Sequence, residues 1–193
     1  AIGLKQALQA AKNHPNYSVP LQAGQGRGVA CAFWINAGMQ SSATINVAAD
    51  GSLHVLTGNP DIGGSRASMA LLAAEVLGIP VETVHPAVAD TDSIGYCDTT
   101  GGSRTTLATG GAVIQAAEML VAELCKRAAA IWNVNLDDVE WSNGRAAART
   151  GGDLLMEGTA AAKGAQKVLT LAELAAMAGA TGGPLCAVAS LHA

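Results

Sequence analysis

TGGSRTTLATGGAVIQAAEMLVAELCKRAAAIW, residues 100–132, joins a glycine-rich turn to the longest helical pattern in the chain. Apolar residues recur along it at the spacing of one helix face: Ala112, Ala116, Leu120, Leu124 and Ala128. The pattern predicts a helix from about Thr105 to Trp132. Because many of these side chains are small, neighbouring elements can pack closely against the helix.

The turn before this helix, residues 100–106, combines features that suit an anion. Its small residues are followed by a hydroxyl, a guanidinium and two further hydroxyls, so backbone N–H groups, side-chain donors and a positive charge meet at a helix start. Unpaired N–H groups and the helix dipole both favour a phosphate at such a position. The alternative is an ordinary helix cap with a flexible approach loop. The candidate anion-binding residues are Gly102, Ser103, Arg104, Thr105 and Thr106.

A second glycine turn has the same arrangement. Residues 58–65, GNPDIGGS, stand directly before a helix predicted over residues 65–77. Gly63, Gly64 and Ser65 are therefore further candidates for binding a phosphate or an extended cofactor. Two such turns in adjacent units could hold one elongated anionic ligand. Two well-capped helices with permissive loops would carry the same sequence, and the residues alone leave both hypotheses open.

The remaining segments predict a mixture of helices and strands. Short helices are predicted over residues 4–12 and 171–178, and a tight turn at Asp50-Gly51. Strands are predicted over residues 29–35, 43–47, 53–56, 81–89, 139–141, 153–156 and 185–191. The strands predicted over residues 139–141 and 153–156 would flank Asn143-Gly144, and residues 158–164 are expected to be a loose loop. Alternating strands and helices after an early antiparallel hairpin indicate an α+β (mixed α/β) fold.

Composition narrows the classes of function. The chain has 193 residues, enough for one large domain or two small ones. Half of its residues are hydrophobic although only 3% are aromatic, so the core must consist mainly of Ala, Val, Leu and Ile. Such a core has few large anchors, which suggests that other parts of a larger molecule pack against it. A net charge of −4 without a Lys/Arg cluster argues against nucleic-acid binding.

Cysteine and histidine patterns indicate no metal site. The four cysteines form no C-x-x-C pair and fit free thiols in a reducing compartment. The four histidines lie far apart in the sequence and are interpreted as structural or solvated. Without a run of about twenty apolar residues or a signal-peptide pattern, we expect a soluble, cytoplasmic chain with no membrane span.

Nucleotide-binding and catalytic motifs give no assignment either. Residues 24–28, GQGRG, precede no predicted helix, and no P-loop motif occurs, so neither NAD nor a P-loop nucleotide is supported. Asp90 and Asp92 could bind a cation or a sugar hydroxyl, but a turn at a strand end explains them more simply. No Ser/His/Asp or Cys/His constellation can be argued. We therefore assign no catalytic and no metal-binding residue.

Several motifs, taken in order, resemble one family. They are residues 51–58 (GSLHVLTG), 61–64 (DIGG), 73–80 (AAEVLGIP), 90–92 (DTD) and 101–106 (GGSRTT). Their order and spacing, over about residues 25–130, are similar to the molybdenum hydroxylases. This family comprises the large subunits of xanthine dehydrogenase, aldehyde oxidase and carbon monoxide dehydrogenase.

The resemblance implies that residues 1–193 are a partial molybdopterin-binding domain of a larger subunit or complex. The turn at Gly63, Gly64 and Ser65 and the turn from Gly102 to Thr106 would hold the pterin and its phosphate. In the family this cofactor is often molybdopterin cytosine dinucleotide. Many members carry Gly-Gln-Gly where this chain has Gly63-Gly64-Ser65. An amide side chain that would touch the cofactor is therefore missing here.

The resemblance also implies what the chain lacks. The family's loops near the metal and the glutamate that serves as catalytic base lie outside the matching motifs, and none can be assigned here. Family enzymes oxidise or hydroxylate an aldehyde or N-heterocycle using water, and pass the electrons to 2Fe-2S and FAD groups. Since this chain has no C-x-x-C cluster, those carriers would belong to other subunits or domains.

The implied partners are the remaining part of the molybdenum subunit, iron–sulfur and flavin subunits, and a small-molecule substrate. Two other hypotheses stay open. One is a non-catalytic molybdopterin-binding or carrier module, and the other is a degenerate domain retained only as folded material. The sequence does not specify the substrate.

Overall fold

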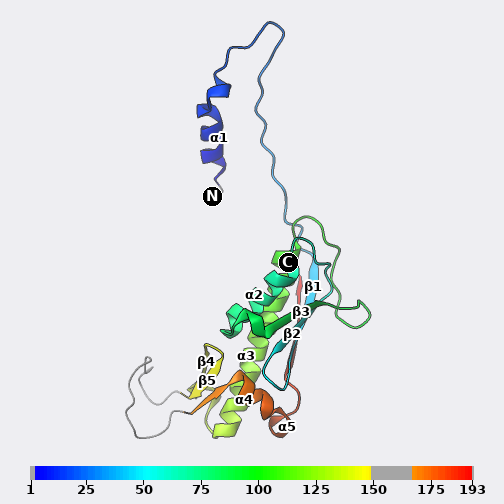
Figure 1. Ribbon diagram of the computed structural model, residues 1–193, viewed down its shortest axis with the longest axis vertical. Helices are drawn as coiled ribbons and strands as arrows, with labels where there is room; N and C mark the ends of the chain where they lie inside the picture. The colour runs from blue at the N-terminus through cyan, green and yellow to red at the C-terminus, as the bar shows by residue number, and fades with distance from the viewer. Residues whose placement is uncertain (1–2, 149–166, 193) are drawn as a thin grey trace, which may run out of the picture. The chain divides into compact units, whose positions relative to one another are not determined.

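The computed structural model describes residues 3–148 and 167–192. The chain divides into two units, residues 1–34 and residues 35–193, which are traced in Figure 1. The second unit contains both glycine turns and all the strands of the described chain.

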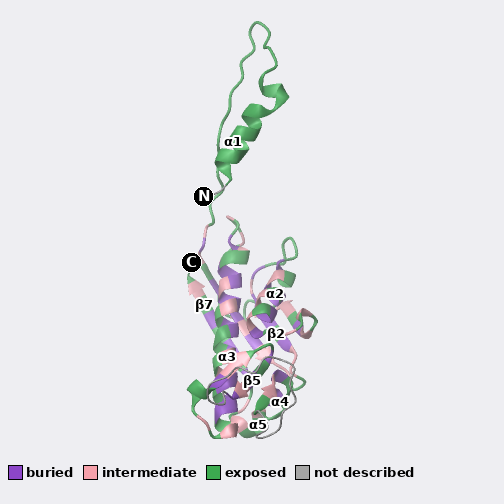
Figure 2. Ribbon diagram, turned by 90° about the vertical axis from the view of Figure 1, so that its left-hand side faces the viewer, coloured by how far each residue is buried: buried purple, intermediate pink, exposed green. Residues whose placement is uncertain are grey.

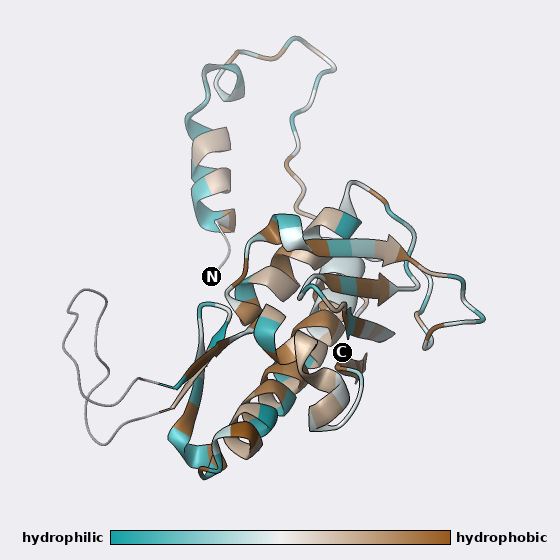
Figure 3. Cartoon of the chain, turned by 60° about the horizontal axis from the view of Figure 1, so that its bottom comes forward, coloured by the Kyte–Doolittle hydropathy of each residue, from teal (hydrophilic) through white to brown (hydrophobic). Residues whose placement is uncertain are grey.

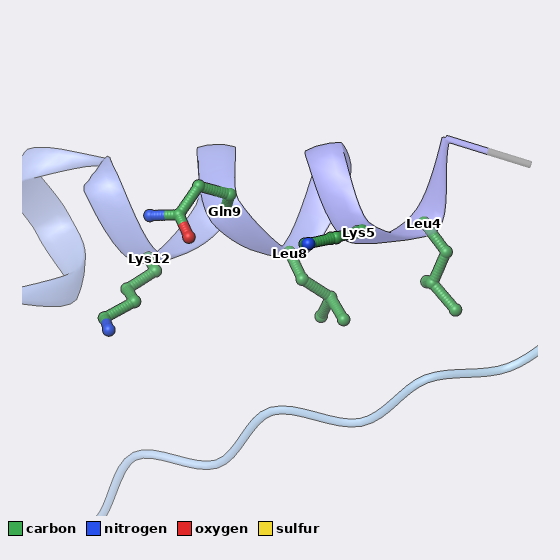
Figure 4. Close-up of a pocket in the computed structure, with 5 residues that line it drawn as sticks. All are labelled: Leu4, Lys5, Leu8, Gln9 and Lys12. Carbon is green, nitrogen blue, oxygen red and sulfur yellow. The ribbon is translucent and has the colours of Figure 1, made fainter.

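The first unit consists mainly of one exposed helix. Helix α1 spans Leu4–Asn13, in agreement with the prediction, and a short 3-10 turn covers Pro15–Tyr17. No residue of α1 is buried. Leu4 and Leu8 project from one side of the helix, beside Lys12 (Figure 4).

A four-stranded sheet organises the second unit. Its strands are β1 (Gln40–Val47), β2 (Leu53–Thr57), β3 (Val84–Val88) and β7 (Cys186–His192), in the order β3-β2-β1-β7. β1 is antiparallel to β2 and β7, whereas β2 and β3 are parallel. The β1–β2 turn lies at Asp50-Gly51 as predicted, and Gly51 adopts a φ of 86° there. This mixed sheet with helices confirms the α+β fold class.

Two helices pack on one face of this sheet. α2 spans Ser65–Leu77, and α3 spans Gly110–Trp132 after a wider π-helical turn, η3, at Thr105–Thr109. α3 contacts β1 and β7, and α2 contacts β3. The predicted stripe along α3 is fully buried, and Figure 2 shows buried residues along the length of this helix. These are Ala112, Ala116, Leu120, Leu124 and Ala128.

The stretch Thr105–Trp132 is long and apolar enough, by length and composition alone, to cross a membrane. Its most apolar 18-residue window is 50% buried inside the fold, where α3 packs against both α2 and the sheet. Figure 3 shows hydrophobic and hydrophilic residues side by side along the helices, as expected when one helix face is buried. The stretch therefore has the pattern of a core helix.

A smaller antiparallel sheet follows α3. It contains β4 (Val139–Ser142), β5 (Arg145–Ala148) and β6 (Val168–Thr170) in sequence order. Short 3-10 turns, η2 and η4, cover Val81–Thr83 and Leu136–Asp138, and short helices α4 and α5 cover Leu171–Ala176 and Ala178–Thr181. The turn at Asn143-Gly144 agrees with the prediction, but the strand after it begins at once, at Arg145. The predicted strand 153–156 and the predicted loop 158–164 lie outside the described residues.

Two strand predictions are corrected. Residues 29–35 form no strand in the described structure, because a β-prone sequence becomes a strand only when another strand lies beside it. The strand predicted over residues 81–89 is confined to β3, since a 3-10 turn occupies its first three positions. β6 was not predicted, and the helix predicted over residues 171–178 is divided at Met177.

Candidate functional site

Both glycine turns start from the same edge of the main sheet. The first follows β2, which ends at Thr57, and the second follows β3, which ends at Val88. Because β2 and β3 are parallel neighbours, both connections leave from the carboxyl edge, where open α/β sheets commonly bind ligands. α2 and α3 then return along the same face of the sheet, so their N-termini lie at this edge. The structure thus brings the two predicted turns to one end of the fold.

The turn before α2 presents bare backbone. Gly63 and Gly64 have φ values of 63° and 77°, and a Cβ added to either would meet no heavy atom within 4 Å. The N–H groups of Gly63, Gly64 and Ser65 donate to no acceptor within the described residues. The Ser65 side chain is buried and donates to the carbonyl of Pro60 at 3.3 Å. Ser65 is therefore the first helical residue and not the cap, and its available group is the backbone N–H.

An ion pair lies beside this turn. The Asp61 carboxylate accepts hydrogen bonds from the Arg66 N–H at 3.0 Å and from Arg66 Nε at 2.8 Å. These bonds, the backbone one first, lower the pKa of Asp61. Nearby, Asn59 is buried with its amide donating to Pro60, while its Oδ1 receives no hydrogen bond from the described residues. The pair is neutral as a whole, so it leaves the helix N-terminus positive.

Residues 36 and 37 support the turn before α3 through hydrogen bonds to its carbonyl groups. The carbonyl of Gly102 accepts from the Ala37 N–H at 3.0 Å, and the carbonyl of Ser103 accepts from the Asn36 amide at 3.0 Å. Gly102 and Ser103 both have left-handed φ values, 58° and 54°. Within the part of the chain that the structure describes, the N–H groups of Gly102, Ser103 and the first two residues of η3 have no acceptor. The carbonyl groups are thus used in the fold, whereas the N–H groups stay available.

The hydroxyl groups of this turn differ in exposure. Ser103 and Thr106 are exposed, and neither side chain forms a hydrogen bond within the described residues. Thr105 is partly buried, and its hydroxyl donates to the hydroxyl of Thr100 at 3.4 Å. Ser103 and Thr106 are therefore the two hydroxyls that can reach a ligand without breaking a contact in the fold.

Arg104 lies inside the fold, with no exposed surface. Its Nε donates to the carbonyl of Gly38 at 2.7 Å, and Nη1 donates to the carbonyl of Asp98 at 2.9 Å. Nη2 donates to the carbonyl of Gln40 and to the hydroxyl of Ser41. The guanidinium therefore holds the turn against the start of β1. Its direct contact with a phosphate stays a prediction, and the geometry gives it a positioning role.

The charge of Arg104 still influences the site. It forms no salt bridge among the described residues, although it is completely buried. Electrostatic interactions fall off less steeply in a protein interior than in water. A buried cation directly beside Ser103 and Thr105 thus favours an anion at the turn without touching it.

Asp98 connects the same turn to β1. Its carboxylate accepts from the Gln40 N–H at 2.9 Å and from the Tyr96 hydroxyl at 2.8 Å. These two hydrogen bonds, followed by the charge of Arg104, lower the pKa of Asp98 from its ordinary value of 3.8, while the carboxylate raises the pKa of Tyr96. Ionised Asp98 is therefore favoured by the folded chain.

We expect ionised Asp98 to make the free energy of unfolding depend on pH in the acid range. Because the pKa of Asp98 is lower in the folded than in the unfolded chain, its stabilising contribution is present above the unfolded value of 3.8 and is lost as the pH falls through the lowered pKa. Asp98→Asn should therefore make stability depend less steeply on pH below about 4. The midpoint of urea unfolding, measured at several pH values, tests this. Asp137→Asn, which removes an exposed carboxylate, is the control, and equal slopes for the two variants would contradict the prediction.

Sequence reasoning missed the segment that supports the second turn. Residues 36–41 and Asp98 provide most of the partners of Gly102, Ser103 and Arg104. Residues 36–41 carry no motif of their own, because their partners lie more than fifty residues away in the sequence. Gly38 and Met39 both have left-handed φ values there, 59° and 68°, and only the glycine signals this in the sequence.

The described residues contain no group of three or more His, Cys, Asp and Glu side chains arranged to hold a metal ion. His54 on β2 and His85 on β3 lie side by side, with ring centroids 5.4 Å apart. Their cross-strand register explains this contact. The chemistry that the described site can perform is thus anion binding through backbone N–H groups and hydroxyls.

Comparison with known proteins relates this chain to molybdenum enzymes. The chain matches the molybdopterin cofactor-binding domain family over residues 4–192. It is 33% identical over 108 residues to the carbon monoxide dehydrogenase large chain of Hydrogenophaga pseudoflava, covering 55% of this chain and 13% of that one. It is 38% identical over 82 residues to xanthine dehydrogenase of Drosophila pseudoobscura pseudoobscura, covering 42% of this chain and 6% of the relative.

The solved structures agree. Reconstituted CO dehydrogenase from Oligotropha carboxidovorans superposes with a TM-score of 0.69 at 26% identity, over 83% of this chain and 20% of that chain. The chain therefore spans only a small part of the length of each of these relatives.

Proposed function

Because this chain belongs to the molybdopterin cofactor-binding domain family, we propose that it holds the molybdopterin of a molybdenum hydroxylase. The named relatives are molybdenum oxidoreductases, which supports the oxidoreductase class. The proposed enzyme oxidises or hydroxylates an aldehyde or N-heterocycle using water. Its catalytic base, its 2Fe-2S group and its FAD would be supplied by other parts of the molybdenum subunit and by partner subunits.

One observation carries this proposal. Two helix N-termini lie at the carboxyl edge of parallel strands, and both are preceded by glycine turns. In these turns the N–H groups of residues 63–65, 102, 103, 105 and 106 have no acceptor within the described residues. Such N–H groups bind phosphate well because they add to the positive end of the helix dipole. The donor set fits a pterin that carries a phosphate or, as we propose, a cytosine dinucleotide.

Each part of the site has a separate task. Gly63, Gly64 and Ser65 offer N–H groups without side-chain obstruction, and this bare surface lets a flat or extended ligand approach the backbone. Ser103 and Thr106 add hydroxyl donors at the second turn. Arg104 keeps that turn in place and contributes charge. When bound, the cofactor supplies the redox chemistry at molybdenum, and this chain orients it.

We expect the exposed hydroxyls to contribute to cofactor retention. Ser103→Gly removes the hydroxyl but accepts the left-handed backbone, and Thr106→Val replaces the hydroxyl with a methyl of similar size. A hydrogen bond to a charged group contributes about 1.5–3 kcal/mol, so each change should weaken cofactor binding by at least about tenfold. The measurement is molybdenum and pterin content of the purified complex after dialysis.

The control for this measurement is Thr181→Val, which changes a partly buried helix end far along the chain from both turns and should retain the cofactor. Full cofactor content in the Ser103 and Thr106 double variant would contradict the assignment of the second turn. A natural complex that contains this chain but no molybdenum would contradict the proposed function as a whole.

A carrier module that stores or delivers molybdopterin is the second candidate. It has the same cofactor contacts, and it is supported by the match to the molybdopterin cofactor-binding domain family. The subunit composition distinguishes the two. Electron-transfer subunits bound stoichiometrically support the hydroxylase, whereas the loaded chain alone supports the carrier. A cytoplasmic location is part of both proposals and is supported by four free cysteines.

A further inference from the structure

We infer that residues 29–35 pair as a β-strand with an open sheet edge in the remaining part of the molybdenum subunit. This apolar segment, VACAFWI, precedes the loop that supports the second glycine turn. The inference rests on the proposed function, because it takes its partner from the molybdenum subunit.

The side chains of the apolar segment lack a packing partner. Val29 is 60% exposed, Phe33 87%, Trp34 76% and Ile35 59%. Four large apolar side chains within seven residues are rarely left in water, and such patches commonly mark an interaction surface. The exposure therefore points to a surface that another protein segment covers.

The backbone of the apolar segment indicates how it is covered. No N–H or C=O group of residues 29–35 forms a hydrogen bond within the described chain. Valine, isoleucine and aromatic residues favour strands, and Cys31, Phe33 and Ile35 would share one face of a strand. Burying these side chains also buries the backbone, whose polar groups then require partners. Addition to a sheet edge satisfies both needs at once.

The remaining part of the molybdenum subunit is the occupant that the observations favour. The family pattern covers residues 4–192, so the apolar segment belongs to the domain itself. The chain spans only 20% of the matching CO dehydrogenase chain, so such enzymes contain much additional polypeptide. Within the main sheet of this chain, one of the two free edges, β3, contains Pro86, which has no N–H to donate. This makes pairing with a second copy at that edge unfavourable.

The position of the apolar segment gives the pairing a function. It leads directly into Asn36 and Ala37, which hydrogen-bond to Ser103 and Gly102. A partner edge that fixes residues 29–35 would therefore fix the second glycine turn relative to the rest of the subunit. This chain and the remaining part of the subunit would then be joined directly beside the cofactor-binding turn.

Hydrogen exchange of the natural complex tests the inference. Amides of residues 29–35 should exchange at least about a hundredfold more slowly in the complex than in this chain alone, because paired strands are protected and unpaired segments are not. Ala32→Pro removes one N–H in the middle of the segment and should lower recovery of the complex by at least about tenfold.

Ala23→Pro is the matched control. Residue 23 precedes Gly24, which has a φ of 84°, in a turn closed by the Gln25 N–H and the Gln22 carbonyl, and proline is favoured at that turn position. Both variants should unfold at the wild-type denaturant concentration when the chain is alone, because residues 23 and 32 are exposed. Equal recovery of the complex with the two variants would overturn the inference.

Three further outcomes distinguish failure of the inference from failure of the proposed function. Fast exchange of residues 29–35 in a complex that contains molybdenum would overturn the inference and leave the proposed function standing. Protection that appears in the chain alone and increases with its concentration would show that a second copy is the occupant. A complex without molybdenum would instead overturn the proposed function.

Discussion

Arg104→Ala should lower the free energy of unfolding of this chain by about 3–5 kcal/mol. Arg104 is fully buried, and its guanidinium donates to the carbonyls of Gly38, Gln40 and Asp98. Alanine would leave these acceptors without donors and would create a cavity as large as the lost side chain. Urea unfolding followed by circular dichroism measures the change.

Two further variants make this prediction specific. Lys126→Ala removes a 73% exposed side chain that lies 3.8 Å from Glu123, and it should cost about 0.5 kcal/mol or less. Arg104→Lys keeps the charge but places its donors on one atom, so it cannot satisfy acceptors spread around a planar guanidinium. Its stability should fall between those of the wild type and the alanine variant. A loss below about 1 kcal/mol for Arg104→Ala would show that the guanidinium does not hold the turn.

Gly102→Ala should be the next most damaging change, at about 2–4 kcal/mol. Gly102 has a φ of 58°, and an added Cβ would lie 2.6 Å from the Cβ of Ala37. The left-handed conformation is unfavourable for alanine, and the contact would push residues 36 and 37 away from the turn. The hydrogen bond between the Ala37 N–H and the Gly102 carbonyl would then weaken, and the turn would lose its support.

The neighbouring glycine is the matched control. A Cβ on Gly101 would meet no heavy atom within 4 Å, and Gly101 is not among the residues with positive φ. Gly101→Ala should therefore keep stability within about 0.5 kcal/mol of the wild type. The two variants are compared by urea unfolding and by molybdenum content of the natural complex. Similar stability and molybdenum content in both variants would rule out a close contact at Gly102.

Local patterns were enough to predict most helices. The stripe from Ala112 to Ala128 predicted the buried face of α3, because helical periodicity depends only on neighbours a few residues away. Gly78, with a φ of 65°, ends α2 at the predicted residue for the same reason. Strand predictions were less complete, since a strand needs a partner that can come from any part of the chain. β6 was missed on that account, and residues 29–35 were assigned to a strand that the described fold does not contain.

The candidate site shows the same division. The glycines at positions 63, 64 and 102 could be recognised in the sequence, because left-handed turns before helices have a local signature. The burial of the Arg104 side chain and its hydrogen-bond partners could not be predicted from the sequence. Its carbonyl partners at Gly38 and Gln40 lie more than sixty residues away, and their selection depends on how β1 packs against the turn.

The sequence by itself determined the two glycine turns, the helices that follow them and the family resemblance, since all of these depend on the order and local spacing of residues. Only the tertiary structure decided that both turns lie at one sheet edge, because this follows from the parallel pairing of β2 with β3. It also decided that Arg104 supports the turn from inside, while unpaired N–H groups and the exposed Ser103 and Thr106 stay available to a ligand. Burial and long-range hydrogen bonds assign these roles, and neither can be derived from the identity of a residue and its close neighbours.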